Sequence, residues 1–154
     1  MPARLMRQDE ILPAKAGADL ALVTSLGDFF ARQAEVKFAY LFGSAASGKA
    51  GDLSDLDLAV CLDGRLGHFR FRLRLIEMLA KELHTEHFDL VVLNKAPIVL
   101  KYEVVKNGIV LKEDRTRRVM FEAAVLQEYL DTAYLRSTHY QYMREQLKEG
   151  LYFG

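Results

Sequence analysis

The sequence predicts an α/β (α+β) fold in which a small mixed β-sheet is flanked by helices. Two observations predict it. Segments with apolar residues at three- and four-residue spacing alternate with short apolar segments that end at Gly, Asp or Asn. One short segment, 56–62, has the two-residue period of a strand, with Leu56, Leu58, Val60 and Leu62 alternating with Asp57, Ala59 and Cys61. The 154 residues suit one domain (1–154), with a core at about 18–112 and a helical C-terminal extension at about 115–148.

The first half of the predicted core contains one helix and two strands. Residues 18–34 are expected to be helical because Leu22, Leu26 and Phe29 line one face. The apolar segment 36–42 is expected to be a buried strand. A tight Gly43-Ser44 turn and a loop containing Gly48 and Gly51 then lead to strand 56–62, which ends at the turn signal Asp63-Gly64.

The second half continues the alternation. Leu73, Ile76, Ala80 and Leu83 predict an amphipathic helix over 68–84, and the next strand is expected at 87–93. Pro97 suits the first turn of a helix at about 97–106, Asn107-Gly108 ends it, and 109–111 is a short strand. Residues 115–148 contain no proline or glycine and are expected to form one long helix with a broad apolar face, marked by Phe121, Val125 and Tyr129.

Composition limits the classes of function. Hydrophobic residues make up 51% and charged residues 27%, and 21 basic residues balance 21 acidic ones. This balance argues against direct nucleic-acid binding, which usually shows as a basic excess. Cys61 is the single cysteine, so an internal disulfide is ruled out and a reduced, cytoplasmic location is expected. No apolar run approaches a membrane span, and the N-terminal residues lack the apolar core of a signal peptide.

Acidic residues at the start of strand 56–62 indicate chemistry. Asp55 and Asp57 point to the same side of the strand and are close enough to hold a divalent cation between them. They follow Gly43, which lets a backbone approach phosphate closely, and Ser44, which can donate its hydroxyl and amide to a phosphate oxygen. This combination favours metal-assisted handling of a nucleoside triphosphate.

A third acid begins the strand expected beside 56–62. Asp89 shares a face with Val91 and Leu93, so we expect it to be partly buried, where a carboxylate is costly unless a cation or a donor satisfies it. Three converging acids suit two Mg²⁺ ions, which can stabilise the attacking and leaving oxygens of an in-line displacement. The residues alone therefore predict a site for Mg²⁺ and a nucleoside triphosphate.

The pattern Gly43-Ser44-x10-Asp55-x-Asp57, with Asp89 on a later strand, resembles the nucleotidyltransferase superfamily that includes DNA polymerase beta, and within it the minimal nucleotidyltransferase (MNT) antitoxins, the MntA-like partners of HEPN toxins. The resemblance covers most of the chain from about residue 20 onward. It includes Phe38-Ala39-Tyr40-Leu41-Phe42-Gly43-Ser44, Leu53-Ser54-Asp55-Leu56-Asp57-Leu58-Ala59-Val60, Asp89-Leu90-Val91-Val92-Leu93-Asn94, and the segment from Phe121 to Asp131.

The resemblance implies a polymerase-beta-like fold and an activity. In that family the protein transfers AMP from ATP to a tyrosine of its HEPN toxin and so silences the toxin's RNase activity. A hetero-oligomer with the toxin is therefore expected. Carried over, Gly43 and Ser44 grip the triphosphate, Asp55 and Asp57 bind Mg²⁺, and Asp89 is the third carboxylate, which helps to activate the tyrosine hydroxyl.

The chain departs from the family pattern directly after the Gly-Ser pair. MNT antitoxins often carry arginines there, whereas this chain has Ala45, Ala46 and Ser47. Lys49 remains nearby as a phosphate-binding cation, or the task shifts to basic residues further along the chain, such as Arg65, Arg70 and Arg74.

Simpler interpretations stand beside these. Gly43-Ser44 alone fits an ordinary turn, Asp55 and Asp57 alone a solvated strand start, and Asp89 alone a strand cap. Two other functions also remain: a non-catalytic antitoxin that acts by direct binding, and an aminoglycoside-type nucleotidyltransferase, although little chain is left for a substrate domain. For His87, an exposed strand residue is favoured over a role beside the acids. The tyrosine-rich C-terminal helix is our hypothesis for the toxin-docking surface.

Overall fold

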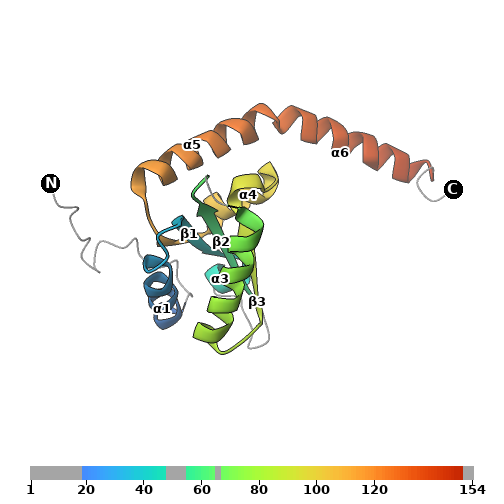
Figure 1. Ribbon diagram of the computed structural model, residues 1–154. Coiled ribbons are helices and arrows are strands. Elements are labelled where there is room, and N and C mark those ends of the chain that lie inside the picture. The colour runs from blue at the N-terminus through green and yellow to red at the C-terminus, as the bar shows by residue number, and fades with distance from the viewer. Residues whose placement is uncertain (1–18, 48–54, 65–66, 151–154) are drawn as a thin grey trace.

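A four-stranded mixed β-sheet forms the centre of the molecule (Figure 1). The computed structural model describes residues 19–47, 55–64 and 67–150. The strands stand in the order β3-β2-β1-β4. β1 is antiparallel to both β2 and β4, whereas β2 and β3 are parallel. The strands are β1 (Val36–Phe42), β2 (Leu56–Leu62), β3 (Phe88–Val92) and β4 (Ile109–Lys112).

The helices lie close to the expected positions, with two differences in the described chain. They are α1 (Leu20–Ala31), α2 (Gly43–Ser47), α3 (His68–Leu83), α4 (Ile98–Asn107), α5 (Arg115–Asp131) and α6 (Ala133–Lys148), together with the 3₁₀ turn η2 (Leu93–Lys95). Gly43-Ser44 is not a tight turn but the start of the short helix α2. The predicted long helix is divided at Thr132, where α5 ends and α6 begins. No helix in the described ranges is long and apolar enough to cross a bilayer.

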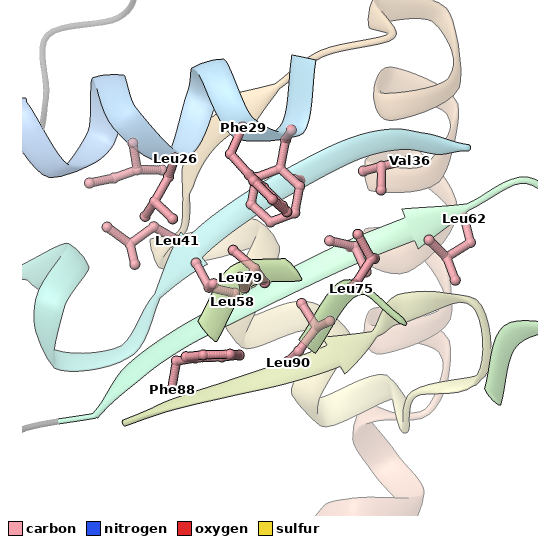
Figure 2. Packing of buried hydrophobic residues seen from close by; sticks show 14 of the residues in the cluster. Leu26, Phe29, Val36, Leu41, Leu58, Leu62, Leu75, Leu79, Phe88 and Leu90 are labelled. Atoms are coloured by element: carbon pink, nitrogen blue, oxygen red, sulfur yellow. The ribbon is translucent and has the colours of Figure 1, made fainter. Parts of the chain in front are cut away.

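One face of the sheet packs against α1 and α3. Figure 2 shows Leu26 of α1 and Leu79 of α3 on the same side of the sheet as Leu41 and Leu58. Each of these four side chains is fully buried. Along each strand, the residues that point to this face alternate with residues that point to the other face. This face is the larger part of the core.

The other face packs against α4 and α5. Its buried side chains include Tyr40 of β1, Ala59 of β2 and Val104 of α4, and Phe121 of α5 packs against them. Because neighbouring strand residues point to opposite faces, Ala59 and Asp57 point to this side, whereas Leu58 points to the α1 and α3 side. The fold therefore places Asp57 on the face that carries α4 and α5.

A polar network ties α5 to this second face. The Tyr40 hydroxyl donates to Glu122 Oε1 over 2.6 Å, and Arg118 Nη1 donates to the same oxygen over 2.8 Å. Arg118 Nη2 also pairs with Glu113 Oε1 over 2.6 Å. Burial, and then the hydrogen bond to Glu122, raise the pKa of Tyr40 far above its ordinary value. The hydroxyl therefore stays protonated and keeps donating to the helix.

Candidate active site

Gly43 forms the junction between β1 and α2, and its backbone conformation disfavours any other residue type at this position. Its φ is +71°, a conformation that side chains with a Cβ rarely adopt. A Cβ built at this position would lie 2.1 Å from Asp57 Oδ2. The glycine thus lets the end of β1 lie directly against the Asp57 carboxylate.

Asp57 and Asp89 lie side by side at the starts of two parallel strands. They are register partners in the β2–β3 pair, and Asp57 also pairs across with Phe42, the residue before Gly43. Asp55 stands one residue before β2. Burial raises the pKa of Asp57, with further contributions from the charges of Asp89 and Asp55. Asp55 and Asp89 therefore lie close enough to Asp57 to disfavour its charged form.

The expectation that Asp89 is partly buried is wrong, because its side chain is exposed. β3 is an edge strand, and Asp89 is its second residue, so one side of the carboxylate faces solvent. Further along β3, Val91 packs against the second core cluster, and Leu93, at the start of η2, is fully buried. Exposure leaves Asp89 accessible to a group brought by another molecule.

His87 is a second neighbour of the acids that the sequence did not favour. Its Nδ1 lies 3.7 Å from Asp55 Oδ1, and both side chains are largely exposed. Its backbone oxygen accepts a hydrogen bond from the Leu56 amide over 3.1 Å, which ties the start of β3 to the start of β2. A histidine two residues before a strand acid was the available signal, but its meaning depends on strand pairing.

The donor atoms at this site suit magnesium that arrives with a nucleotide. In the described parts of the chain, no three His, Cys, Asp or Glu side chains are spaced to hold a metal ion by themselves. Mg²⁺, however, usually binds through one or two carboxylates and completes its shell with phosphate oxygens and water. The hard carboxylate oxygens of Asp55, Asp57 and Asp89 fit that pattern, and a cation would offset their mutual repulsion.

Directly after Ser44, where the resemblance led us to look for arginines that bind phosphate, this chain has alanines. Ala45 and Ala46 are buried in α2 and pack with the core beneath α1 and α3, so this short helix turns them away from solvent. Ser44 beside them is half-buried. Lys49 lies outside the described residues, as do the loop glycines at 48 and 51.

The alternative basic residues stand elsewhere. Arg70 and Arg74 belong to α3, which covers the face of the sheet opposite to Asp57. Arg72 of the same helix donates from Nε to the Leu90 carbonyl over 2.8 Å. These arginines therefore do not lie over the carboxylates, and Arg65 is outside the described residues.

Two hollows of the described surface have none of the three acids among their lining residues. The larger, of about 670 Å³, is lined by α3 and the start of β3, including Ile76 and Phe88. The smaller, of about 380 Å³, lies along α6.

A glycine at a strand-to-helix junction, set against paired carboxylates at the starts of two strands, is the arrangement expected of a nucleotidyltransferase. The sequence agrees with this class, since residues 24–117 match the family described as Polymerase beta, Nucleotidyltransferase. The match spans more than half of the chain, and the chain belongs to this family. The predicted fold class is confirmed.

Solved structures place the chain more narrowly, as a homologue of MNT antitoxins. A crystal structure of a toxin–antitoxin with AMP-PNP is 26% identical, covers 77% of this chain and 98% of the matched chain, and has a TM-score of 0.65. A structure of the toxin–antitoxin MntA–HepT is 26% identical over 80% of this chain and 94% of the other, with a TM-score of 0.57.

A third structure carries a modified toxin. It contains tri-AMPylated Shewanella oneidensis HEPN toxin in complex with MNT antitoxin. The match is 25% identical over 77% of this chain and 96% of the matched chain, with a TM-score of 0.58. No curated protein sequence matches this chain. The resemblance to MNT antitoxins inferred from the motifs is confirmed.

Proposed function

We propose that this protein is an antitoxin that transfers AMP from ATP to a tyrosine of a HEPN toxin and so neutralises it. The observation that carries the proposal is the contact between Gly43 and Asp57, with Asp57 in register with Asp89. A backbone that can approach a triphosphate thus lies next to the carboxylates that would hold its metal. The AMPylated toxin in a similar complex supports the identity of the acceptor.

Each predicted site residue has a role in this proposal. The backbone at Gly43 and the hydroxyl and amide of Ser44 bind the triphosphate, with Lys49 as a cation for its oxygens. Asp55, Asp57 and Asp89 bind two Mg²⁺ ions together with the nucleotide phosphates. When bound, the metal would neutralise charge on the attacking and leaving oxygens.

The reaction is an in-line displacement at the α-phosphorus. The tyrosine oxygen forms a bond to that phosphorus, and the bond from phosphorus to the bridging oxygen of the β-phosphate breaks, so that pyrophosphate leaves with the electron pair. Asp89 accepts the phenolic proton. Its exposure allows a tyrosine carried by another protein to reach it, since no described side chain buries it.

A non-catalytic antitoxin is the second candidate, and one observation favours it. Ala45 and Ala46 are buried, so arginines that would bind phosphate are absent and α2 has no room for them on that side. The three carboxylates argue the other way, because a purely blocking protein has no need to keep mutually repelling acids together. Transfer to a small molecule is the third candidate, and the AMPylated toxin of a similar complex favours a protein acceptor over it.

Labelled ATP distinguishes these functions. The protein would be incubated with Mg²⁺ and the HEPN protein encoded by a neighbouring gene, using ATP labelled at the α- or the γ-phosphate. We expect label from the α-position on the toxin, none from the γ-position, and one pyrophosphate released for each AMP transferred. Asp55→Asn/Asp57→Asn should abolish labelling, and Asp28→Asn on exposed α1 is the matched control. A stable, unlabelled complex would favour the non-catalytic antitoxin.

A further inference from the structure

Helix α6 carries an apolar face that nothing in the described chain covers. None of its residues is buried. Figure 1 shows α6 continuing from α5 and projecting away from the sheet and its other helices. Four large side chains on it are between 47% and 65% exposed: Leu135, Tyr140, Tyr142 and Leu147. Exposed aromatic and aliphatic residues at this density are typical of a protein interface.

Most of the large apolar residues of α6 share one side of the helix, and Tyr134 lies on the other. At 100° per residue, the four large side chains fall within one broad arc together with Met143. The opposite arc is mostly polar and carries Ser137, Gln141, Arg144 and Lys148 beside Tyr134. Since most helical stability in proteins comes from packing an amphipathic face, a helix with this pattern and no buried residue is expected to pack on another molecule.

Aromatic and polar contacts hold α6 in a fixed direction. The rings of Tyr102 on α4 and Tyr129 on α5 stack with centroids 3.6 Å apart and an interplanar angle of 4°. The guanidinium of Arg136 lies 3.8 Å from the centroid of the Tyr129 ring. Arg136 Nη2 also donates to the Tyr129 carbonyl over 2.6 Å, and Nη1 to the Thr132 hydroxyl. These contacts preorganise α6 for binding, which reduces the entropy lost on association.

The position of α5 indicates which molecule binds. α5 packs on the same face of the sheet as Asp57, through Phe121 against Phe38 and through Glu122 against Tyr40. A protein bound along the helix that continues from α5 is therefore tethered on the carboxylate side of the molecule. A transferase that modifies a protein needs a docking surface on the side of the molecule that carries its site, whereas pairing with a second copy would not require it.

We infer that the apolar face of α6, defined by Leu135, Tyr140, Tyr142 and Leu147, is the docking surface for the toxin substrate, which presents a complementary apolar surface. The inference rests on the proposed function and deepens it. Docking on α6 holds the toxin while one of its tyrosines enters the carboxylate site. The similar structures are likewise complexes of a toxin with an antitoxin.

Replacing residues on the two faces of α6 with glutamate tests the docking surface. Tyr142→Glu/Leu147→Glu alters the apolar arc, and Ser137→Glu/Gln141→Glu puts the same charge on the polar arc as the control. Because none of the four residues is buried, both variants should melt like the wild type. The apolar-arc variant should bind the neighbouring-gene HEPN protein roughly 30-fold or more weakly. Its KM for that protein should rise, with KM for ATP unchanged, and the control should match the wild type.

The outcomes separate this inference from the proposed function. Undiminished binding and transfer by the apolar-arc variant would overturn the docking surface while leaving the AMP transferase intact. If the wild type transfers no AMP but the apolar-arc variant alone loses binding, the docking surface stands and the reaction does not. If the isolated wild type is a dimer, and the variant becomes a monomer that still binds the HEPN protein, a second copy covers α6 and the inference is wrong.

Discussion

Gly43 and Asp57 constrain each other, because the backbone of one lies where the carboxylate of the other needs room. The positive φ and the 2.1 Å approach of a built Cβ to Oδ2 both exclude a side chain at position 43. The left-handed backbone and the absence of a side chain at position 43 together leave room for the Asp57 carboxylate. The glycine is therefore required by the site itself and not by a simple reversal of chain direction.

Gly43→Ala should lower both stability and activity. The left-handed backbone costs an alanine about 1–2 kcal/mol, and displacement of the Asp57 carboxylate adds to that cost. Chemical denaturation measures the first effect and AMP transfer the second. Gly64→Ala is the control, because a Cβ there meets no atom within 4 Å and the φ of Gly64 lies outside the left-handed region. Equal stability of the two variants would contradict the described junction.

Asp57→Asn should abolish transfer yet stabilise the ligand-free protein at neutral pH. The folded state raises the pKa of Asp57, so it disfavours the ionised form that exists at pH 7, and an amide removes that cost. The advantage of the variant should shrink as the pH falls towards the ordinary aspartate pKa of about 3.9, where wild-type Asp57 is protonated. Transfer should fall roughly a hundredfold to a thousandfold or more. Thermal melts across pH, together with the transfer assay, check both effects.

At the residue scale, the sequence predicted the identity of the acids better than their surroundings. The alternation in 56–62 correctly placed Asp57 on the side of Ala59, because strand period is a local property. The exposure of Asp89 and the 3.7 Å approach of His87 to Asp55 depend on which strand forms the edge of the sheet. That is a long-range outcome, which alternation within one strand does not encode.

Among the elements, α5 is the one whose attachment the sequence did not indicate. Its link to β1 runs through Tyr40 and Glu122, which are 82 positions apart in the chain, with Arg118 on the same carboxylate. Nothing in the local pattern around either residue marks the pair. The division at Thr132 was missed for a related reason. No glycine or proline stands there, and the junction is held by Arg136, whose partners are Tyr129 and Thr132.

The attachment of α5 should weaken in alkali. Since the folded state raises the pKa of Tyr40, its contribution to stability is complete below the unfolded tyrosine pKa of about 10 and is lost as the pH rises above that value. The stability advantage of the wild type over Tyr40→Phe should therefore shrink progressively as the pH rises above about 10. Tyr134→Phe, at a 77% exposed position, is the control that should show no such change. Urea titrations at several pH values measure it, and parallel pH profiles for wild type and Tyr40→Phe would contradict the network.

At the scale of the whole molecule, the sequence predicted the mixed sheet and most element positions. Strand 36–42 was predicted with the observed bounds, as was 56–62, and Asp89 does lie near the start of a strand beside β2. These successes share a cause, since each depends on an apolar period or a Gly, Asp or Asn boundary that acts locally. The direction in which α6 projects had no such local signal.

Metal and nucleotide should stabilise the molecule together. The open, mutually repelling acids predict that Mg²⁺ alone has a small effect on the melting temperature, whereas Mg²⁺ with a non-hydrolysable ATP analogue raises it by about 5 °C or more at a hundredfold excess over Kd. Asp57→Asn should show no such rise. Differential scanning fluorimetry measures it, and an equal rise with the analogue in EDTA would argue against a metal at the carboxylates.

The most direct test of the account is the intact mass of the neighbouring-gene HEPN protein, made by cell-free synthesis so that it arrives unmodified. It would be incubated with Mg²⁺, ATP and either wild-type protein or Asp57→Asn. We expect the mass of the HEPN protein to increase by one or more AMP units with wild type and not to change with the variant. An unchanged mass with wild type, under conditions where the two proteins form a stable complex, would contradict catalysis and identify an antitoxin that acts by binding.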